Sequence, residues 1–76
     1  MRTIGLYRGP TPDEMKNYSA ELIEADSREG QVVSRLYGVV EYPALVVTQD
    51  DGRLVAIWQE KLPTRADYLH VANPLN

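Results

Sequence analysis

The sequence predicts a small α/β protein in which helices pack on a β-sheet, and three local features carry this prediction. The run Ala44–Val47 is apolar, rich in β-branched residues and too short for a helix, so it fits a strand that is buried on both faces. The turn residues Asp50–Gly52 connect it to a second strand-like run, Arg53–Trp58, as in an antiparallel hairpin. A helix precedes this hairpin and ends at Gly38, because glycine takes the left-handed conformation past a helix end without steric cost.

Pro43 fixes where the buried strand begins. Inside a central strand a proline would remove a hydrogen bond of the ladder, so Pro43 belongs at the first position of the strand. The residue before it, Tyr42, is then restricted to an extended conformation.

The first 15 residues predict a strand followed by a helix start. The mostly apolar run Thr3–Arg8 ends at Gly9-Pro10, which is typical of a strand followed by a turn. Thr11 then fits a helix N-cap, with Pro12 at the first helical position and Glu14 completing a capping box.

The segment Ala20–Asp26 fits two structures. Met15, Tyr18 and Leu22 share one helical face, so the helix that starts at Pro12 can run to about residue 24. Alanine and glutamate favour that continuation, whereas the same segment can also form a second strand of the sheet. The residues alone leave both open.

Two further helices are predicted. Asp26 or Ser27 caps the first, which ends before Gly38 and presents an apolar inner face made of Val32, Val33, Leu36 and Tyr37. Pro63–Asp67 begins the second helix, with Leu69 and Ala72 on its inner side and Asn73-Pro74 at its end.

Composition limits the classes of function. With 76 residues the chain is expected to form a single domain, 1–76, that buries about 60% of its unfolded surface. The net charge is −3, and the lysines and arginines are scattered, so we expect neither nucleic-acid binding nor attraction to an anionic membrane. No apolar run approaches the roughly 20 residues that span a bilayer, and the N-terminus lacks an apolar signal core, so a cytoplasmic protein is expected.

The absence of cysteine excludes thiol chemistry. The chain has no cysteine, so it contains no disulfide, no thiolate nucleophile and no cysteine-ligated zinc. The single histidine, His70, has no carboxylate at helical spacing beside it and fits a surface position. We therefore expect no metal site and no cofactor.

The order of these signals resembles the second half of thioredoxin and glutaredoxin proteins. The resemblance rests on a helix leading into Tyr37-Gly38-Val39, then Pro43, an apolar strand and the Asp51-Gly52 hairpin. It implies a thioredoxin-like (glutaredoxin-like) sandwich with a four-stranded mixed sheet in the order 2-1-3-4 and flanking helices. It also implies a cis Tyr42-Pro43 bond, and it favours the strand for Ala20–Asp26.

The resemblance extends to the first strand, where it reveals a departure from the family. In the family, a strand containing Leu-Tyr leads to a Cys-x-x-Cys motif that opens a helix. Here Leu6-Tyr7 is followed by Pro12 and Met15 at the positions of the two cysteines. Neither side chain can exchange disulfides, so a dithiol oxidoreductase activity is excluded.

A candidate site follows from the same resemblance. The loop Gly9–Met15 and the dipeptide Tyr42-Pro43 should meet at one end of the sheet, where the family pairs the backbone beside its proline with an extended peptide or with glutathione. The candidate partner-binding residues are Tyr7, Pro12, Met15, Tyr42 and Pro43.

Three functions fit the sequence. The first is a redox-inactive thioredoxin-like module that binds a protein or an extended peptide at this site. The second is a small structural protein that oligomerises through a sheet edge or Trp58. The third is an enzyme that uses bound glutathione, although the Gly-Gly-x-Asp segment that holds glutathione in the family is replaced by Gln59–Pro63.

Overall fold

The computed structural model describes residues 1–72 and shows a four-stranded mixed sheet flanked by helices. The strands are β1 (Arg2–Tyr7), β2 (Glu21–Glu24), β3 (Ala44–Thr48) and β4 (Leu54–Gln59). Their order in the sheet is β2-β1-β3-β4, which confirms the predicted order. β1 is parallel to β2 and antiparallel to β3, and β3 and β4 form a hairpin.

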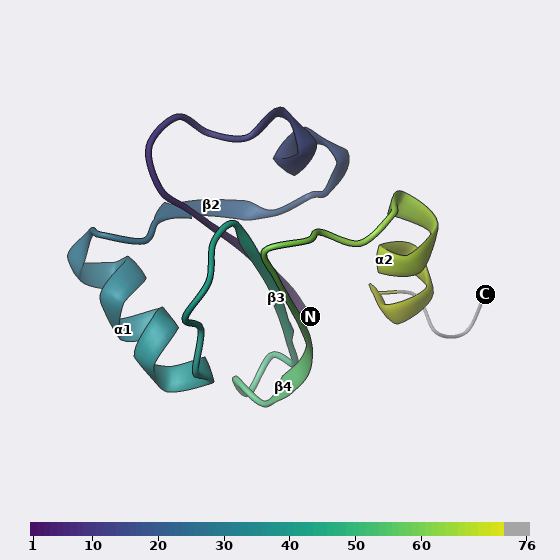
Figure 1. Ribbon diagram of the computed structural model, residues 1–76. Coiled ribbons are helices and arrows are strands. Elements are labelled where there is room, and N and C mark those ends of the chain that lie inside the picture. The colour runs from purple at the N-terminus through teal and green to yellow at the C-terminus, as the bar shows by residue number, and fades with distance from the viewer. Residues whose placement is uncertain (73–76) are drawn as a thin grey trace.

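Helices cover both faces of the sheet. Helix α1 (Arg28–Tyr37) lies on one side of the sheet and helix α2 (Arg65–Ala72) lies on the other (Figure 1). None of the helices in residues 1–72 is long and apolar enough to cross a bilayer.

The ambiguous segment is a strand, and the helix before it is short. Glu21–Glu24 pairs with β1, which settles the choice between helix and strand. The helix predicted from Pro12 is a single 3₁₀ helix, η1 (Asp13–Asn17). The predicted capping box is wrong: Pro12 is itself the N-cap, with an extended ψ of 137°, and no side chain caps the helix. Because the helix begins one residue later than predicted, Thr11 lies too early in the chain to cap it.

Both ends of α1 are as predicted. The Ser27 hydroxyl accepts a hydrogen bond from the Gly30 N–H at 3.0 Å, which is an N-cap. Gly38 ends the helix in the left-handed conformation, with φ at 70°.

The buried face of α1 differs from the predicted one. Val33 is buried and Tyr37 is half-buried, but Val32 and Leu36 are 60% and 69% exposed. Two small residues, Gly30 and Ser34, complete the face that contacts the sheet. The apolar face of the helix is therefore wider than the part that the sheet covers.

β3 connects two hydrophobic clusters, because all five of its residues are buried. Its side chains alternate between the faces of the sheet. The cluster on the α1 side contains Ile4, Leu6, Ile23, Val33, Val39, Ala44 and Val46. The cluster on the η1 and α2 side contains Met15, Tyr18, Leu45, Val47 and Tyr68.

The predicted hairpin is confirmed, and the inner face of α2 is corrected. The turn is closed by the Gly52 N–H, which donates to the Gln49 carbonyl at 2.9 Å. In α2 the buried side chain is Tyr68, whereas Leu69, predicted to face inward, is 40% exposed. Tyr68 is preferred because its ring packs edge-on against Tyr18, with centroids 5.0 Å apart, and its hydroxyl hydrogen-bonds Thr3 at 2.9 Å. The predicted end of the helix at Asn73-Pro74 lies outside the described residues.

Candidate functional site

Three segments converge at one end of the sheet around a cavity of about 400 Å³. β3 is antiparallel to both β1 and β4, so the residue that starts β3 lies beside the residues that follow β1 and β4. The cavity is lined by Arg8, Pro12, Val40, Glu41, Tyr42, Pro43 and Glu60. These residues come from the loop after β1, the loop before β3 and the residue after β4.

Tyr42 is held from two sides. Its hydroxyl donates a hydrogen bond to the Ser34 hydroxyl oxygen of α1 at 2.7 Å. The Arg8 guanidinium lies over its ring, 4.6 Å from the centroid, and is also 3.5 Å from the Asp26 carboxylate. A cation–π contact at an exposed site contributes about 0.5–1 kcal/mol, so Arg8 orients the ring without locking it. These two contacts orient the Tyr42 side chain as one wall of the cavity.

The end of β4 fixes the loop before β3. The Gln59 side-chain oxygen accepts from the backbone N–H of Val40 at 2.8 Å and of Glu41 at 3.1 Å. The Glu60 N–H donates to the Pro43 carbonyl at 2.9 Å. These bonds hold the loop on both sides of Tyr42.

The backbone of Tyr42 itself has no hydrogen-bond partner within residues 1–72. The Tyr42-Pro43 bond is cis, as predicted, and Pro43 has no N–H to offer. Backbone groups of folded proteins are almost always paired with protein or with water. The structure thus places one unpaired donor and one unpaired acceptor in the residue that forms a wall of the cavity.

Two carboxylates face one another at the cavity. A hydrogen bond with the Glu60 carboxyl, and then the negative charge of Glu60, raise the pKa of Glu41. Both residues are exposed, and the ordinary ionised forms repel each other across the opening. The lining therefore carries two carboxylates and one guanidinium, and that guanidinium already contacts Asp26 and Tyr42.

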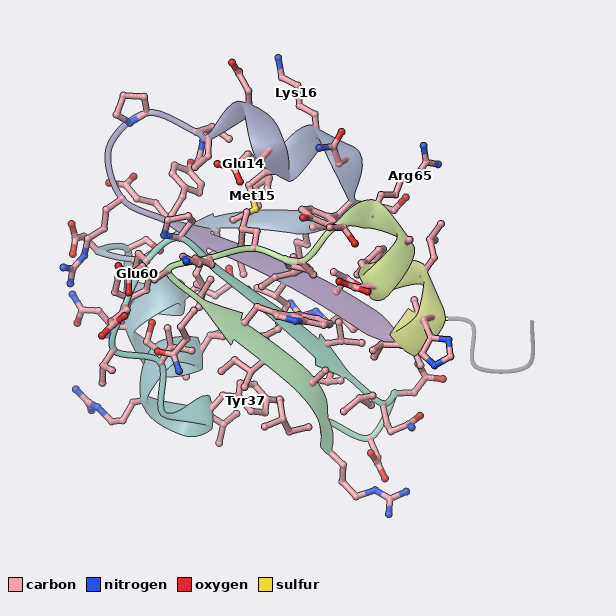
Figure 2. The ribbon with its side chains drawn as sticks, turned by 45° about the vertical axis from the view of Figure 1, so that its right-hand side comes forward. Glu14, Met15, Lys16, Tyr37, Glu60 and Arg65 are labelled. Atoms are coloured by element: carbon pink, nitrogen blue, oxygen red, sulfur yellow. The ribbon has the colours of Figure 1, made fainter. Side chains whose placement is uncertain are left out.

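The structure brings together three of the five candidate residues. Pro12, Tyr42 and Pro43 line the cavity, although Pro12 is distant in sequence from the other two. Tyr7, the last residue of β1, is half-buried and lies outside the lining. Met15 points from η1 down to the sheet, where it is 1% exposed (Figure 2). A Cβ added to Gly5 would lie only 2.9 Å from the Met15 sulfur. Met15 therefore fills the core beneath η1 and does not reach the cavity.

Four lining residues were not among the candidates: Arg8, Val40, Glu41 and Glu60. The position of Arg8 in the sequence could have identified it as a lining residue, because Arg8 directly follows a strand that ends at the predicted site. No sequence feature identifies Glu60 as a lining residue, because its position depends on a backbone φ of 68° that glutamate rarely adopts. Figure 2 shows Glu60 at the end of β4, beside the loop before β3.

The cavity lining offers backbone hydrogen-bonding groups, an aromatic ring and charged side chains. Within residues 1–72, no three histidine, aspartate or glutamate side chains are grouped so as to hold a metal ion. His70 is exposed in the last turn of α2, away from the cavity lining.

Comparisons with known proteins identify no relative: no family model, no curated protein and no solved structure matches this chain.

Proposed function

We propose that this chain is a thioredoxin-like module without redox chemistry that binds an extended peptide segment of a partner protein at the cavity. The observation that carries the proposal is the unpaired backbone of Tyr42, held in place by bonds to its neighbours on both sides. An extended peptide offers the complementary N–H and C=O groups at the spacing of a β-strand. The cavity volume of about 400 Å³ is in the usual range for a ligand site.

The thioredoxin-like assignment rests on two supports. One is the sheet order β2-β1-β3-β4 with a cis proline before β3. The other is the location of Pro12, which lines the cavity at the position where the resemblance places the first cysteine. A proline in place of a thiol keeps the surface and removes the reactive group, which favours binding without catalysis.

The charges at the cavity favour a basic peptide. Glu41 and Glu60 have no positively charged partner among the ion pairs of the described residues. A lysine or arginine of the peptide would separate the two carboxylates and neutralise both. Glutathione is less well supported, because its own carboxylates would approach the same pair.

The experiment follows backbone amide signals during titration with three probes. Two are short synthetic peptides of threonine, valine and serine that differ only in a central lysine or glutamate, and the third is glutathione. We expect the lysine peptide to shift the Tyr42 amide signal and to bind several-fold more tightly than the glutamate peptide, with a dissociation constant on the order of 10–1,000 µM. Glutathione should leave the signal unchanged.

A matched pair of variants tests the location. Tyr42 and Tyr37 both pack against the same hydrophobic cluster and both use their hydroxyl in a hydrogen bond, but only Tyr42 lines the cavity. Tyr42→Ala should abolish binding of the lysine peptide, whereas Tyr37→Ala should retain it. Equal loss in both variants, or binding that persists in folded Tyr42→Ala, would place the peptide elsewhere.

A further inference from the structure

The outer face of α1 exposes two aliphatic side chains that lie one helical turn apart, Val32 and Leu36. α1 is the outermost element on its side of the sheet, and no other described element lies over it (Figure 1). Apart from Val40, which lines the cavity, every other exposed large hydrophobic side chain in residues 1–72 is less than half exposed. Exposed apolar surface with a charged rim is typical of an interaction site.

Two arginines provide that charged rim. Arg28, Val32 and Leu36 follow one another at four-residue spacing, and Arg35 lies beside them on the same face of the helix. Neither Arg28 nor Arg35 has an ion-pair partner within residues 1–72. The single acidic residue of α1, Glu29, lies 3.7 Å from the Arg2 guanidinium. The face therefore carries two uncompensated positive charges around an apolar centre.

The stability of α1 in water does not account for this composition. Arg28 is the first residue of the helix, at the positive end of the helix dipole, where a cation is unfavourable. Val32 is exposed in the middle of the helix, where valine is less favourable than alanine. Arg35 alone suits the dipole, because it lies in the last turn. A bound partner would give both Arg28 and Val32 a favourable contact.

We infer that this α1 face, made of Arg28, Val32, Arg35 and Leu36, docks an acidic amphipathic helix of a partner protein. The apolar stripe of such a helix would cover Val32 and Leu36, and carboxylates along its borders would pair with the two arginines. The face is about 12 Å long at 1.5 Å per residue, so roughly two to three turns of the partner helix cover it.

Charge also argues against the other occupants of this face. A second copy of the chain would bring Arg28 and Arg35 of both copies into one contact, while Glu29 of each copy already faces Arg2. A nucleic acid would leave the apolar pair uncovered between its phosphates. Docking at α1 is independent of peptide binding at the cavity, since none of these four residues lines the cavity.

The experiment uses two synthetic helical peptides of about 18 residues, a length at which a helix can form in water. Both carry one stripe of leucines on an alanine background, and they differ only in whether glutamate or lysine borders the stripe. In fluorescence anisotropy with the unmodified protein, the glutamate peptide should bind with a dissociation constant on the order of 10–100 µM, about tenfold more tightly than the lysine peptide. Its affinity should fall as salt rises from about 0.05 to 0.5 M. Equal binding of the two peptides, or no binding of the glutamate peptide, overturns the inference.

Matched glutamine substitutions locate the contact. Leu36→Gln removes apolar surface without adding charge, Arg28→Gln removes a charge, and each should weaken binding of the glutamate peptide about fivefold or more. Leu22→Gln on β2 and Arg65→Gln on α2 change exposed residues of the same types and should alter binding less than about twofold. Tyr42→Ala should also retain it, which separates the α1 face from the cavity. Binding that persists in folded Leu36→Gln and Arg28→Gln, or that falls equally in the two controls, overturns the inference.

A lipid arm tests the remaining occupant. The unmodified protein is sedimented with vesicles of phosphatidylcholine, with and without phosphatidylserine, and should remain in the supernatant with both. Binding to the phosphatidylserine vesicles that is lost in Leu36→Gln and in Arg28→Gln would assign the α1 face to an anionic bilayer and refute the partner helix.

Discussion

Replacing Gly30 by alanine should destabilise the protein, although the same change stabilises most helices. Gly30 lies in the first turn of α1, where alanine is favoured over glycine by about 1 kcal/mol. A Cβ at this position, however, would be 2.0 Å from the Glu24 carbonyl oxygen and 2.8 Å from the Ala25 Cα. These are backbone atoms, which cannot rotate away.

The size of the effect follows from that distance. Real Cβ contacts are essentially never shorter than 3.0 Å, so α1 must move away from the end of β2 by about 1 Å. Overpacking of this kind costs about 1–3 kcal/mol, and a rigid backbone neighbour places Gly30→Ala at the upper end. After subtraction of the helix-propensity gain, a net loss of about 2 kcal/mol remains, which corresponds to a fall in Tm of about 8–16 °C for a domain of this size.

Urea and thermal unfolding, followed by far-ultraviolet circular dichroism, measure this loss. Gly38→Ala is the matched control, since a Cβ there meets no atom within 4 Å and its cost arises only from a φ of 70°. That conformational cost is about 1–2 kcal/mol. A Gly30→Ala variant as stable as the unmodified protein would refute the close approach of α1 to β2, whatever Gly38→Ala shows.

Three other predictions concern the cavity and the chain start. Ser34→Ala and Tyr42→Phe should each cost about 1 kcal/mol, and the double variant should cost less than their sum; full additivity would mean that the two hydroxyls do not interact. Because the folded pKa of Glu41 is raised, the folded state binds this proton more tightly than the unfolded state, so stability should fall as pH rises from the ordinary value of 4.5 through the raised pKa. Urea midpoints across this range should show the fall in the unmodified protein and a smaller one in Glu41→Gln; parallel curves would contradict the Glu60 contact. The N-terminal amine, by hydrogen bond and then by charge, lowers the pKa of Asp50, so Asp50 contributes stability that is lost as pH falls below 3.8. Acetylation of that amine should raise the pKa of Asp50 in an NMR titration and should remove this loss of stability.

The sequence predicted those parts of the fold that depend on local chemistry. Ser27 and Gly38 bound α1 because a hydroxyl cap and a left-handed glycine act within a few residues. The hairpin around Gly52 and the buried strand before it have the same local origin. Periodicity alone did not predict the strand order, which came from the resemblance to thioredoxin and glutaredoxin proteins.

The predictions that were wrong depend on where elements distant in the sequence lie in the fold. Val32 and Leu36 are as apolar as Val33, and nothing in the helix itself shows which of them the sheet covers. The contact is made by Gly30 and Ser34 because small side chains allow close approach, which a hydrophobic pattern does not record.

The candidate site was predicted only in part, again because it depends on how distant segments pack. Pro12 lines the cavity with Tyr42 and Pro43, because the antiparallel arrangement of β1 and β3 forces their ends together. Glu60 depends on the unusual backbone turn after β4, and Met15 on the space above Gly5. Neither can be read from residue type alone.

The central strand β3 makes the two hydrophobic clusters thermodynamically inseparable. Ala44 and Val46 belong to one cluster, and Leu45 belongs to the other, so one backbone segment is a wall of both. Losing the packing on either face frees β3, and with it the support of the opposite face. The protein should therefore unfold in a single cooperative transition, in which a probe on α1 and a probe at Trp58 report the same midpoint.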